Sequence, residues 1–267
     1  MKRSMLAAAA VVLVGSAAPS AAGTLVVSGD TTIVSRLVTG VATGNPALAG
    51  NAAFFQNILG GGDRASIYTF SVVTSFPNPP LGTQLAGFYN GLPGIGASTF
   101  DGGITSGVLT GADLLVVLGR SNPFTSTETS LVRGFLFGGG NVLLTGDSDN
   151  IAFGSNALTN DLLAGIGSSI RLNQVTQGIG DQFATGSEIL ADPLTAGVSS
   201  FGYGRTTTVS GGTTLFLNDD GNAFIAAETF GAVPEPATWA MMLVGFGAVG
   251  HTMRRRRGVA VPASASA

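Results

Sequence analysis

The stretch DLLVVLGRSNPFTSTETSLVRGFLFGGGNVLLTGDSDN, residues 113–150, decides the fold. It begins with a continuous apolar run at 113–118, which is typical of a strand buried on both faces of a parallel sheet. A second apolar run at 141–145 has the same character. Two such strands in one short stretch predict the core of a parallel sheet.

A helix is predicted between these two strands. Thr125 and Glu128 stand at the spacing of a capping box, which marks a helix N-terminus. A triple glycine at 138–140 ends the helix. Strand, helix and strand at this spacing indicate a βαβ unit, and so a parallel sheet with helices on both faces. One apolar face runs along the predicted helix, formed by Leu131, Val132, Phe135 and Leu136.

Outward from this unit the same alternation continues, and we expect one exported domain over residues 23–232. Its predicted fold is α/β, with a mostly parallel flavodoxin-like sheet, helices on both faces and a C-terminal β-hairpin. The hairpin is expected from runs at 213–217 and 223–227 around the turn sequence 218–222. Further strands are predicted at 24–28 and 66–72, and helices at 51–59, 85–90 and 156–163.

Composition excludes several kinds of chemistry. The 267 residues include no Cys, which rules out disulfides, thiolate metal sites and a cysteine nucleophile. His251 is the single histidine and lies near the C-terminus. Residues 23–232 hold six arginines, no lysine and fourteen acidic residues, a formal charge of −8. So acidic a domain repels phosphate backbones, and we expect no nucleic-acid partner.

The N-terminus reads as a secretory signal peptide over residues 1–22. Lys2 and Arg3 form a positive region, an apolar run follows at 5–14, and small residues precede the expected cleavage site. Signal peptidase and the export machinery are therefore expected partners. A buried N-terminal helix is the alternative.

The C-terminus has the order of a recognition motif, a membrane span and a basic cluster. Pro234, Glu235 and Pro236 form an extended segment ahead of an apolar stretch. That stretch is just long enough for a transmembrane helix, and the arginines after it predict that everything N-terminal lies outside the cytoplasm. The membrane-anchor residues are Trp239, Arg254, Arg255, Arg256 and Arg257.

Residues 233–257 resemble the PEP-CTERM sorting signal of Gram-negative bacteria. The resemblance implies recognition of Pro234, Glu235 and Pro236 by an exosortase in the inner membrane, then processing and display at the cell surface, commonly in bacteria that make exopolysaccharide. His251 and the extra tail 258–267, expected to be disordered, depart from the pattern. A permanent, unprocessed single-pass anchor is the alternative.

Residues 113–163 resemble glutamine-amidotransferase-like flavodoxin-fold domains. Catalytic members carry a cysteine after a strand like 141–145, where this sequence has Gly146, Asp147 and Ser148. The domain also has no histidine, so the resemblance implies a form without that activity. The same absence argues against a serine hydrolase built on Ser148, since the hydroxyl lacks a histidine base.

Candidate ligand residues follow the strand at 141–145. Asp147, Asp149 and Asn150 lie where an open α/β sheet binds ligands, and they suit Ca²⁺ or sugar hydroxyls. The alternative is that they form a turn and cap the next helix. Asp219 and Asp220 are weaker calcium candidates and more typical of a hairpin turn. The sequence 245–250 matches GxGxxG but lies inside the expected membrane segment, so no nucleotide is implied.

These observations predict a non-catalytic cell-surface or matrix protein with no cofactor, and exopolysaccharide or another surface component as its candidate ligand. Two alternatives stay open. One is a secreted hydrolase that works through carboxylates alone, as glycosidases do. The other is a β-sandwich adhesion module.

Overall fold

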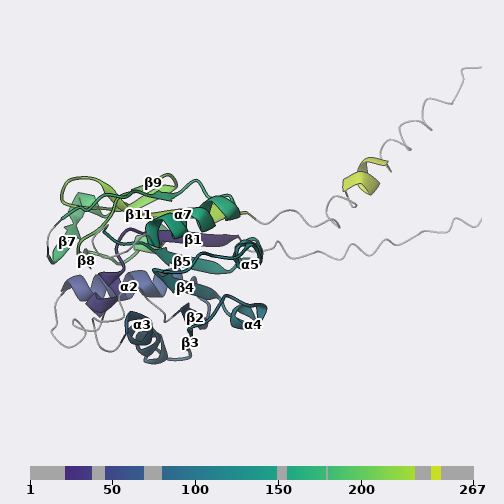
Figure 1. Cartoon of the computed structure of the whole chain (residues 1–267), viewed down its shortest axis with the longest axis horizontal. Coiled ribbons are helices and arrows are strands. Elements are labelled where there is room, and N and C mark those ends of the chain that lie inside the picture. Colours follow the sequence, from purple (N-terminus) through teal and green to yellow (C-terminus); the bar gives the residue numbers. More distant parts are fainter. Residues whose placement is uncertain are drawn as a thin grey trace, which may run out of the picture. The chain divides into compact units, whose positions relative to one another are not determined.

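A computed structural model describes residues 22–37, 46–68, 80–148, 155–178, 180–231 and 242–247. Residues 21–232 form one compact unit, described here by itself. It is a mixed α/β domain built on a seven-stranded sheet (Figure 1). The strands of that sheet are β1 (Gly23–Ser28), β2 (Arg64–Tyr68), β3 (Gly96–Phe100), β4 (Leu114–Leu118), β5 (Asn141–Thr145), β10 (Thr213–Leu217) and β11 (Ala223–Phe230).

The sheet is mostly parallel, as expected. Its strand order is β10-β11-β1-β5-β4-β2-β3, and β1 to β5 all run in one direction. The flavodoxin sheet has the spatial strand order 2-1-3-4-5. Here the five parallel strands, numbered along the chain, lie in the spatial order 1-5-4-2-3, so the two sheets differ. β1 lies beside β5, so the chain passes from β1 across β5 and β4 to reach β2.

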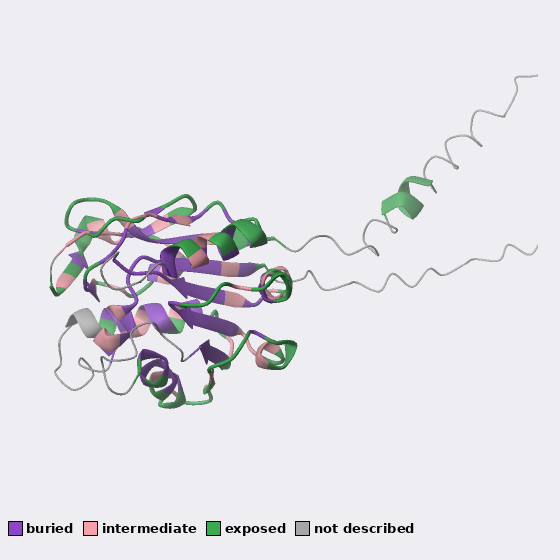
Figure 2. Cartoon of the chain, viewed as in Figure 1, coloured by how far each residue is buried: buried purple, intermediate pink, exposed green. Residues whose placement is uncertain are grey.

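Helices cover both faces of the sheet, which confirms that part of the prediction. One face packs against the 3-10 helix η1 (Thr32–Val34), α2 (Pro46–Ile58) and α3 (Leu81–Asn90). The other packs against α5 (Ser126–Phe137) and α7 (Ser155–Ile166). Alternate residues of β4 enter the two cores, which explains why the strand is apolar throughout and buried along its length (Figure 2).

The capping box predicted for the central helix is present. Thr125 Oγ1 accepts a hydrogen bond from the Glu128 amide at 3.2 Å, and Glu128 Oε2 accepts from the Thr125 amide at 2.8 Å. The last turn of α5 is closed by Gly138. The helix therefore begins and ends where its sequence predicts.

The C-terminal hairpin is also confirmed, with β10 and β11 antiparallel and β11 continuing antiparallel to β1. The β-sandwich alternative is wrong, because five parallel strands with helices on both faces form the core. The sequence analysis missed β3, the short helix α4 (Ser106–Leu109) and two small antiparallel pairs. These pairs are β6 (Arg171–Leu172) with β9 (Val209–Ser210), and β7 (Gln182–Thr185) with β8 (Ser200–Tyr203).

The chain's ends fall almost wholly outside the described residues. This holds for the predicted signal peptide 1–22 up to its last residue, for Pro234, Glu235, Pro236 and Trp239, for Arg254, Arg255, Arg256 and Arg257, and for the tail 258–267. Residues 242–247 are helical and exposed. No helix in the described ranges is long and apolar enough to span a bilayer.

Candidate functional site

Three neighbouring strands end in the same way. Ser28 of β1, Thr145 of β5 and Leu118 of β4 stand opposite one another in the sheet. In each strand a glycine follows, and then a charged residue. These charged residues are Asp30, Asp147 and Arg120, which the register places along the carboxyl edge of the sheet.

The boundary between β1 and β5 is a topological switch point. The chain leaves β1 for η1 and α2 on one face, and it leaves β5 for α7 on the other. Ligands of open α/β sheets bind at such points, outside the carboxyl ends of the strands. Asp30 and Asp147 both lie here.

Side-chain hydrogen bonds join the two strand ends. Thr31 Oγ1 lies 3.0 Å from Thr145 Oγ1 and donates to the Gly146 carbonyl at 2.9 Å. The glycine in each strand end lies against another segment of the chain. A Cβ on Gly29 would lie 2.0 Å from the Thr207 carbonyl oxygen, and one on Gly146 would lie 2.3 Å from Asn156 Oδ1. Both Gly-Asp steps are therefore sterically required.

Asp30 is buried and surrounded by donors. Its Oδ1 accepts from the amide of Thr32 at 2.6 Å and from Thr32 Oγ1 at 2.7 Å. Its Oδ2 accepts from the Gly204 amide at 2.6 Å, which ties η1 to the chain after β8. Burial raises the pKa of Asp30, but these donors favour its ionised form.

Asp147 is also buried, at 2% exposure, but is poorly satisfied. Its Oδ1 accepts from the Ser148 amide at 2.7 Å, while its Oδ2 has no hydrogen-bond partner among the described residues. The Ser148 hydroxyl, fully buried, has none there either. The Asn156 side chain holds the Asp147 main chain through bonds of 3.0 and 2.7 Å. Asn156, near the start of α7, therefore fixes the main chain of Asp147 just after β5.

The two carboxyl groups interact. Burial and then the negative charge of Asp30 raise the pKa of Asp147 to about 8. The proton that the pair shares near neutral pH is assigned to Asp147, because its pKa of about 8 lies above that pH. Burial raises the pKa of both carboxyl groups, and two neighbouring carboxyl groups of this kind can share one proton.

The other predicted ligand residues do not join this cluster. Asp149 and Asn150 lie outside the described residues. Asp219 and Asp220 are exposed in the β10–β11 turn, where Asp219 accepts from Gln182 Nε2 at 2.8 Å. Within the described ranges, no group of three or more acidic or histidine side chains is placed to hold a metal ion.

Arg120, at the end of β4, is occupied. Its Nη1 donates to Glu128 Oε1 at 2.6 Å in a buried ion pair, and its guanidinium lies over the Phe124 ring at 4.5 Å. Burial alone would raise the pKa of Glu128, but the bonds from Arg120, Thr125 and Ile104 lower it to about 2. This ion pair fixes the start of α5. Glu128 neutralises the charge of Arg120, so that charge is not available to bind a ligand.

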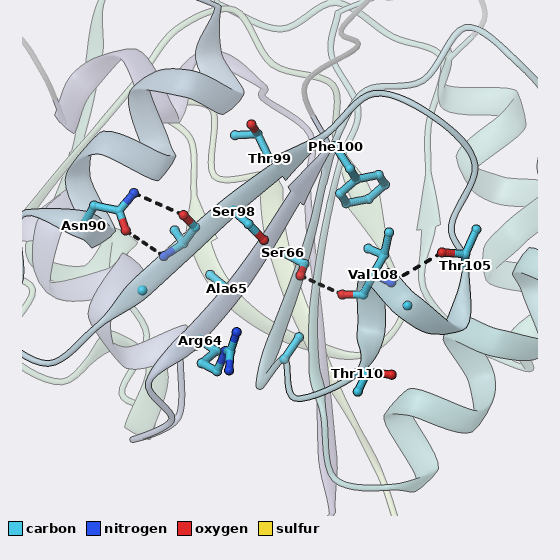
Figure 3. Close-up of a pocket in the computed structure, with 14 residues that line it drawn as sticks. Arg64, Ala65, Ser66, Asn90, Ser98, Thr99, Phe100, Thr105, Val108 and Thr110 are labelled. Carbon is cyan, nitrogen blue, oxygen red and sulfur yellow. Dashed lines mark hydrogen bonds between the residues drawn. The ribbon is translucent and has the colours of Figure 1, made fainter.

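A second candidate site is an open groove of about 570 Å³ beside the edge strand β3 (Figure 3). Its floor is formed by register pairs of β2 and β3, with Arg64 opposite Gly96, then Ser66 opposite Ser98. The pair of Tyr68 and Phe100 follows, with ring centroids 5.5 Å apart. The other wall is the α4 segment, where the Val108 carbonyl accepts from Ser66 Oγ at 2.7 Å.

The groove is polar and carries one cation. Arg64 is exposed and makes no ion pair with any described residue. None of the fourteen residues that line the groove is Asp, Glu or His. Across β3 from Ser66 in Figure 3, Asn90 bonds both the amide and the carbonyl of Ala97 at 2.8 and 3.1 Å. This contact occupies the Ala97 amide and carbonyl near the start of β3, which disfavours the addition of a partner strand there.

Comparisons with known proteins bear on the C-terminus. Residues 232–257 match the PEP-CTERM protein-sorting motif. The chain carries an exosortase sorting signal. No curated protein matches the chain. A solved structure titled "mmIFT52 N-terminal domain" is similar at 15% identity, covering 64% of this chain and 85% of that chain, with a TM-score of 0.44.

The PEP-CTERM motif supports an exported protein processed by an exosortase, in agreement with the sequence prediction. The amidotransferase-like resemblance of residues 113–163 stays a prediction. The sequence analysis missed Asp30 and the groove. A signal for Asp30 was present, because SGDT at 28–31 and TGDS at 145–148 follow two buried strands in the same way.

Proposed function

We propose that this protein is an exported, exosortase-processed surface protein whose α/β domain is a non-catalytic module that binds exopolysaccharide. The observation that carries the proposal is the groove beside β3. It combines serine and threonine hydroxyls, one guanidinium and an aromatic ring. Such a lining supplies hydrogen bonds to sugar hydroxyls and an apolar surface for a sugar ring.

The same lining argues against chemistry in the groove. Glycosidases need a pair of carboxyl groups across the scissile bond, and none of the described residues that line the groove is acidic. Its open shape along a strand edge suits a long polymer better than a small molecule enclosed on all sides. A sorting signal of the PEP-CTERM type brings the domain to the cell surface, where such polymers lie.

Isothermal titration calorimetry of the protein purified from its host, with the host's exopolysaccharide, tests the proposal. Arg64→Ala removes a charged hydrogen-bond donor worth about 1.5–3 kcal/mol, so the affinity should fall by about 10- to 100-fold. Ser98→Trp should fill the groove and abolish binding. Arg205→Ala is the matched control, because Arg205 is exposed and outside the groove. Equal affinities for all these proteins would refute the site.

The sorting step has a separate test. Replacement of Pro234, Glu235 and Pro236 by alanine should leave the protein in the membrane at its unprocessed mass. An unchanged mass and location would remove the processing claim, while the groove proposal would stand.

A carboxylate-dependent hydrolase is the second candidate function, and the coupled pair of Asp30 and Asp147 favours it. In that case Asp147, whose pKa is raised to about 8, would donate a proton and Asp30 would act as the base. Release of reducing ends from the polysaccharide, lost in Asp147→Asn and kept in Asp219→Asn, would select this function. No release by the unaltered protein would exclude it.

A further inference from the structure

We propose that Asp30, Asp147 and Ser148 form a binding site for a hard divalent cation, Mg²⁺ or Ca²⁺, at the carboxyl edge between β1 and β5. This site is separate from the groove beside β3. The inference rests on side chains that the fold brings together and leaves unsatisfied.

The first observation is a pair of buried carboxyl groups. Asp30 and Asp147 are 0% and 2% exposed, and each stands two residues after a strand end that the register sets opposite the other, Ser28 and Thr145. The charge of Arg36 acts on Asp30, but the Arg36 Nη2 atom is paired with Asp181. Arg120 is paired with Glu128. The two carboxyl groups therefore lack a dedicated positive partner among the described residues, which is unusual for buried acids.

The second observation concerns the hydrogen bonds at this point. The Ser148 hydroxyl is fully buried and close enough to the Asp147 carboxyl to act on it, but it makes no hydrogen bond of normal geometry with the described part of the chain. Asp147 Oδ2 is unpartnered as well. Buried polar atoms are nearly always satisfied, so two neighbouring orphan oxygens indicate a missing ligand. A cation takes both oxygens at once.

The chemistry of these oxygens selects the class of ion. Two carboxylates and a hydroxyl are hard oxygen donors, and the domain has neither Cys nor His. Zinc and other soft ions are therefore disfavoured. Mg²⁺ commonly binds through one or two carboxylates and keeps several waters, whereas Ca²⁺ needs six to eight oxygens. With three protein side chains, the site fits Mg²⁺ with retained waters better than Ca²⁺.

A bound cation would also join two parts of the fold. Asp30 holds η1 and the Gly204 segment, while Asp147 is held by Asn156 of α7. An ion between the two carboxylates would link the connections on opposite faces of the sheet. Cation binding should therefore stabilise the folded state.

Thermal unfolding of the full chain tests this site, after EDTA treatment and with added MgCl₂ or CaCl₂ at constant ionic strength. At about 100 times its dissociation constant, the ion should raise Tm by about 5–10 °C. Asp147→Asn should remove the shift and Ser148→Ala should reduce it. Asp219→Asn, an exposed acid elsewhere, should keep it in full.

Two results would overturn the proposal. One is the absence of a shift with either ion in the unaltered protein. The other is an equal shift in Asp147→Asn and Asp219→Asn, which would place the ion elsewhere. Asp147→Asn introduces a neutral side chain of the same shape, so its cooperative unfolding in EDTA shows that a lost shift is not a lost fold.

Discussion

Replacement of Asp147 by asparagine should stabilise the protein, and by more as the pH rises. In the cation-free protein the pKa of Asp147 is raised from 3.8 to about 8, chiefly by burial and then by Asp30. The folded state therefore holds a proton that the unfolded chain releases above pH 4. A group of this kind stabilises fully below its unfolded pKa, and that contribution is lost as the pH rises through the folded pKa.

The size of the effect follows from the shift. Between the ordinary pKa and pH 7 lie about 3 units, each worth about 1.4 kcal/mol, so the cost at pH 7 is about 4 kcal/mol. Asparagine is neutral at every pH and bears no such cost. The stability of Asp147→Asn relative to the unaltered protein should therefore rise by up to about 4 kcal/mol between pH 4 and pH 7, and level off above pH 8.

Urea unfolding from pH 4 to pH 9 in EDTA measures this difference. Asp219→Asn is the control, because it makes the same chemical change at an exposed position in the β10–β11 turn. If Asp147→Asn and the unaltered protein gave parallel curves across this range, Asp147 would be ionised in the folded state, and the reasoning about the shared proton would be refuted.

Three further predictions concern the same fold. Asp30→Asn should act in the opposite direction to Asp147→Asn and destabilise the protein by about 1–3 kcal/mol. The new side-chain NH₂ group would face a hydrogen-bond donor such as the Gly204 main-chain amide, and urea unfolding at pH 7 measures the sign of the effect. Glu128→Gln should lower the free energy of unfolding by about 3–5 kcal/mol, because it leaves Arg120 buried without its charged partner. The unaltered protein should lose stability as the pH falls from 4.5 towards 2, and thermal scans should show that this loss is smaller in the variant. Tyr89→Phe should cost about 1 kcal/mol, because the buried hydroxyl donates to a main-chain carbonyl at 2.7 Å; a chemical-denaturation midpoint checks it.

Local and strongly patterned features could be predicted from the sequence. The apolar runs at 113–118 and 141–145, the capping box at Thr125 and the hairpin around 218–222 each depend on residues close in the chain. These features depend on interactions between residues close in the sequence, so the local sequence is enough to predict them. The sheet order could not be predicted in this way, because the place of β1 beside β5 depends on contacts across more than 100 residues.

The site residues also differ in whether the local sequence could identify them. Asp147 could be proposed because it directly follows a recognisable strand. Asp30 can be recognised as a site residue only once the register places β1 beside β5. The Gly204 amide that donates to its carboxylate comes from a distant part of the sequence. The groove depends on β3, whose sequence GASTF has no apolar run because it is an exposed edge strand.

The central claim is that the domain binds a polysaccharide in the groove beside β3. Hydrogen exchange of the full chain, with and without the host's exopolysaccharide, tests it most directly. The account predicts slowed exchange confined to peptides over residues 96–112 and the start of β2, and its loss in Ser98→Trp. Unchanged exchange there, or protection confined to residues 28–32 and 145–148, would contradict it.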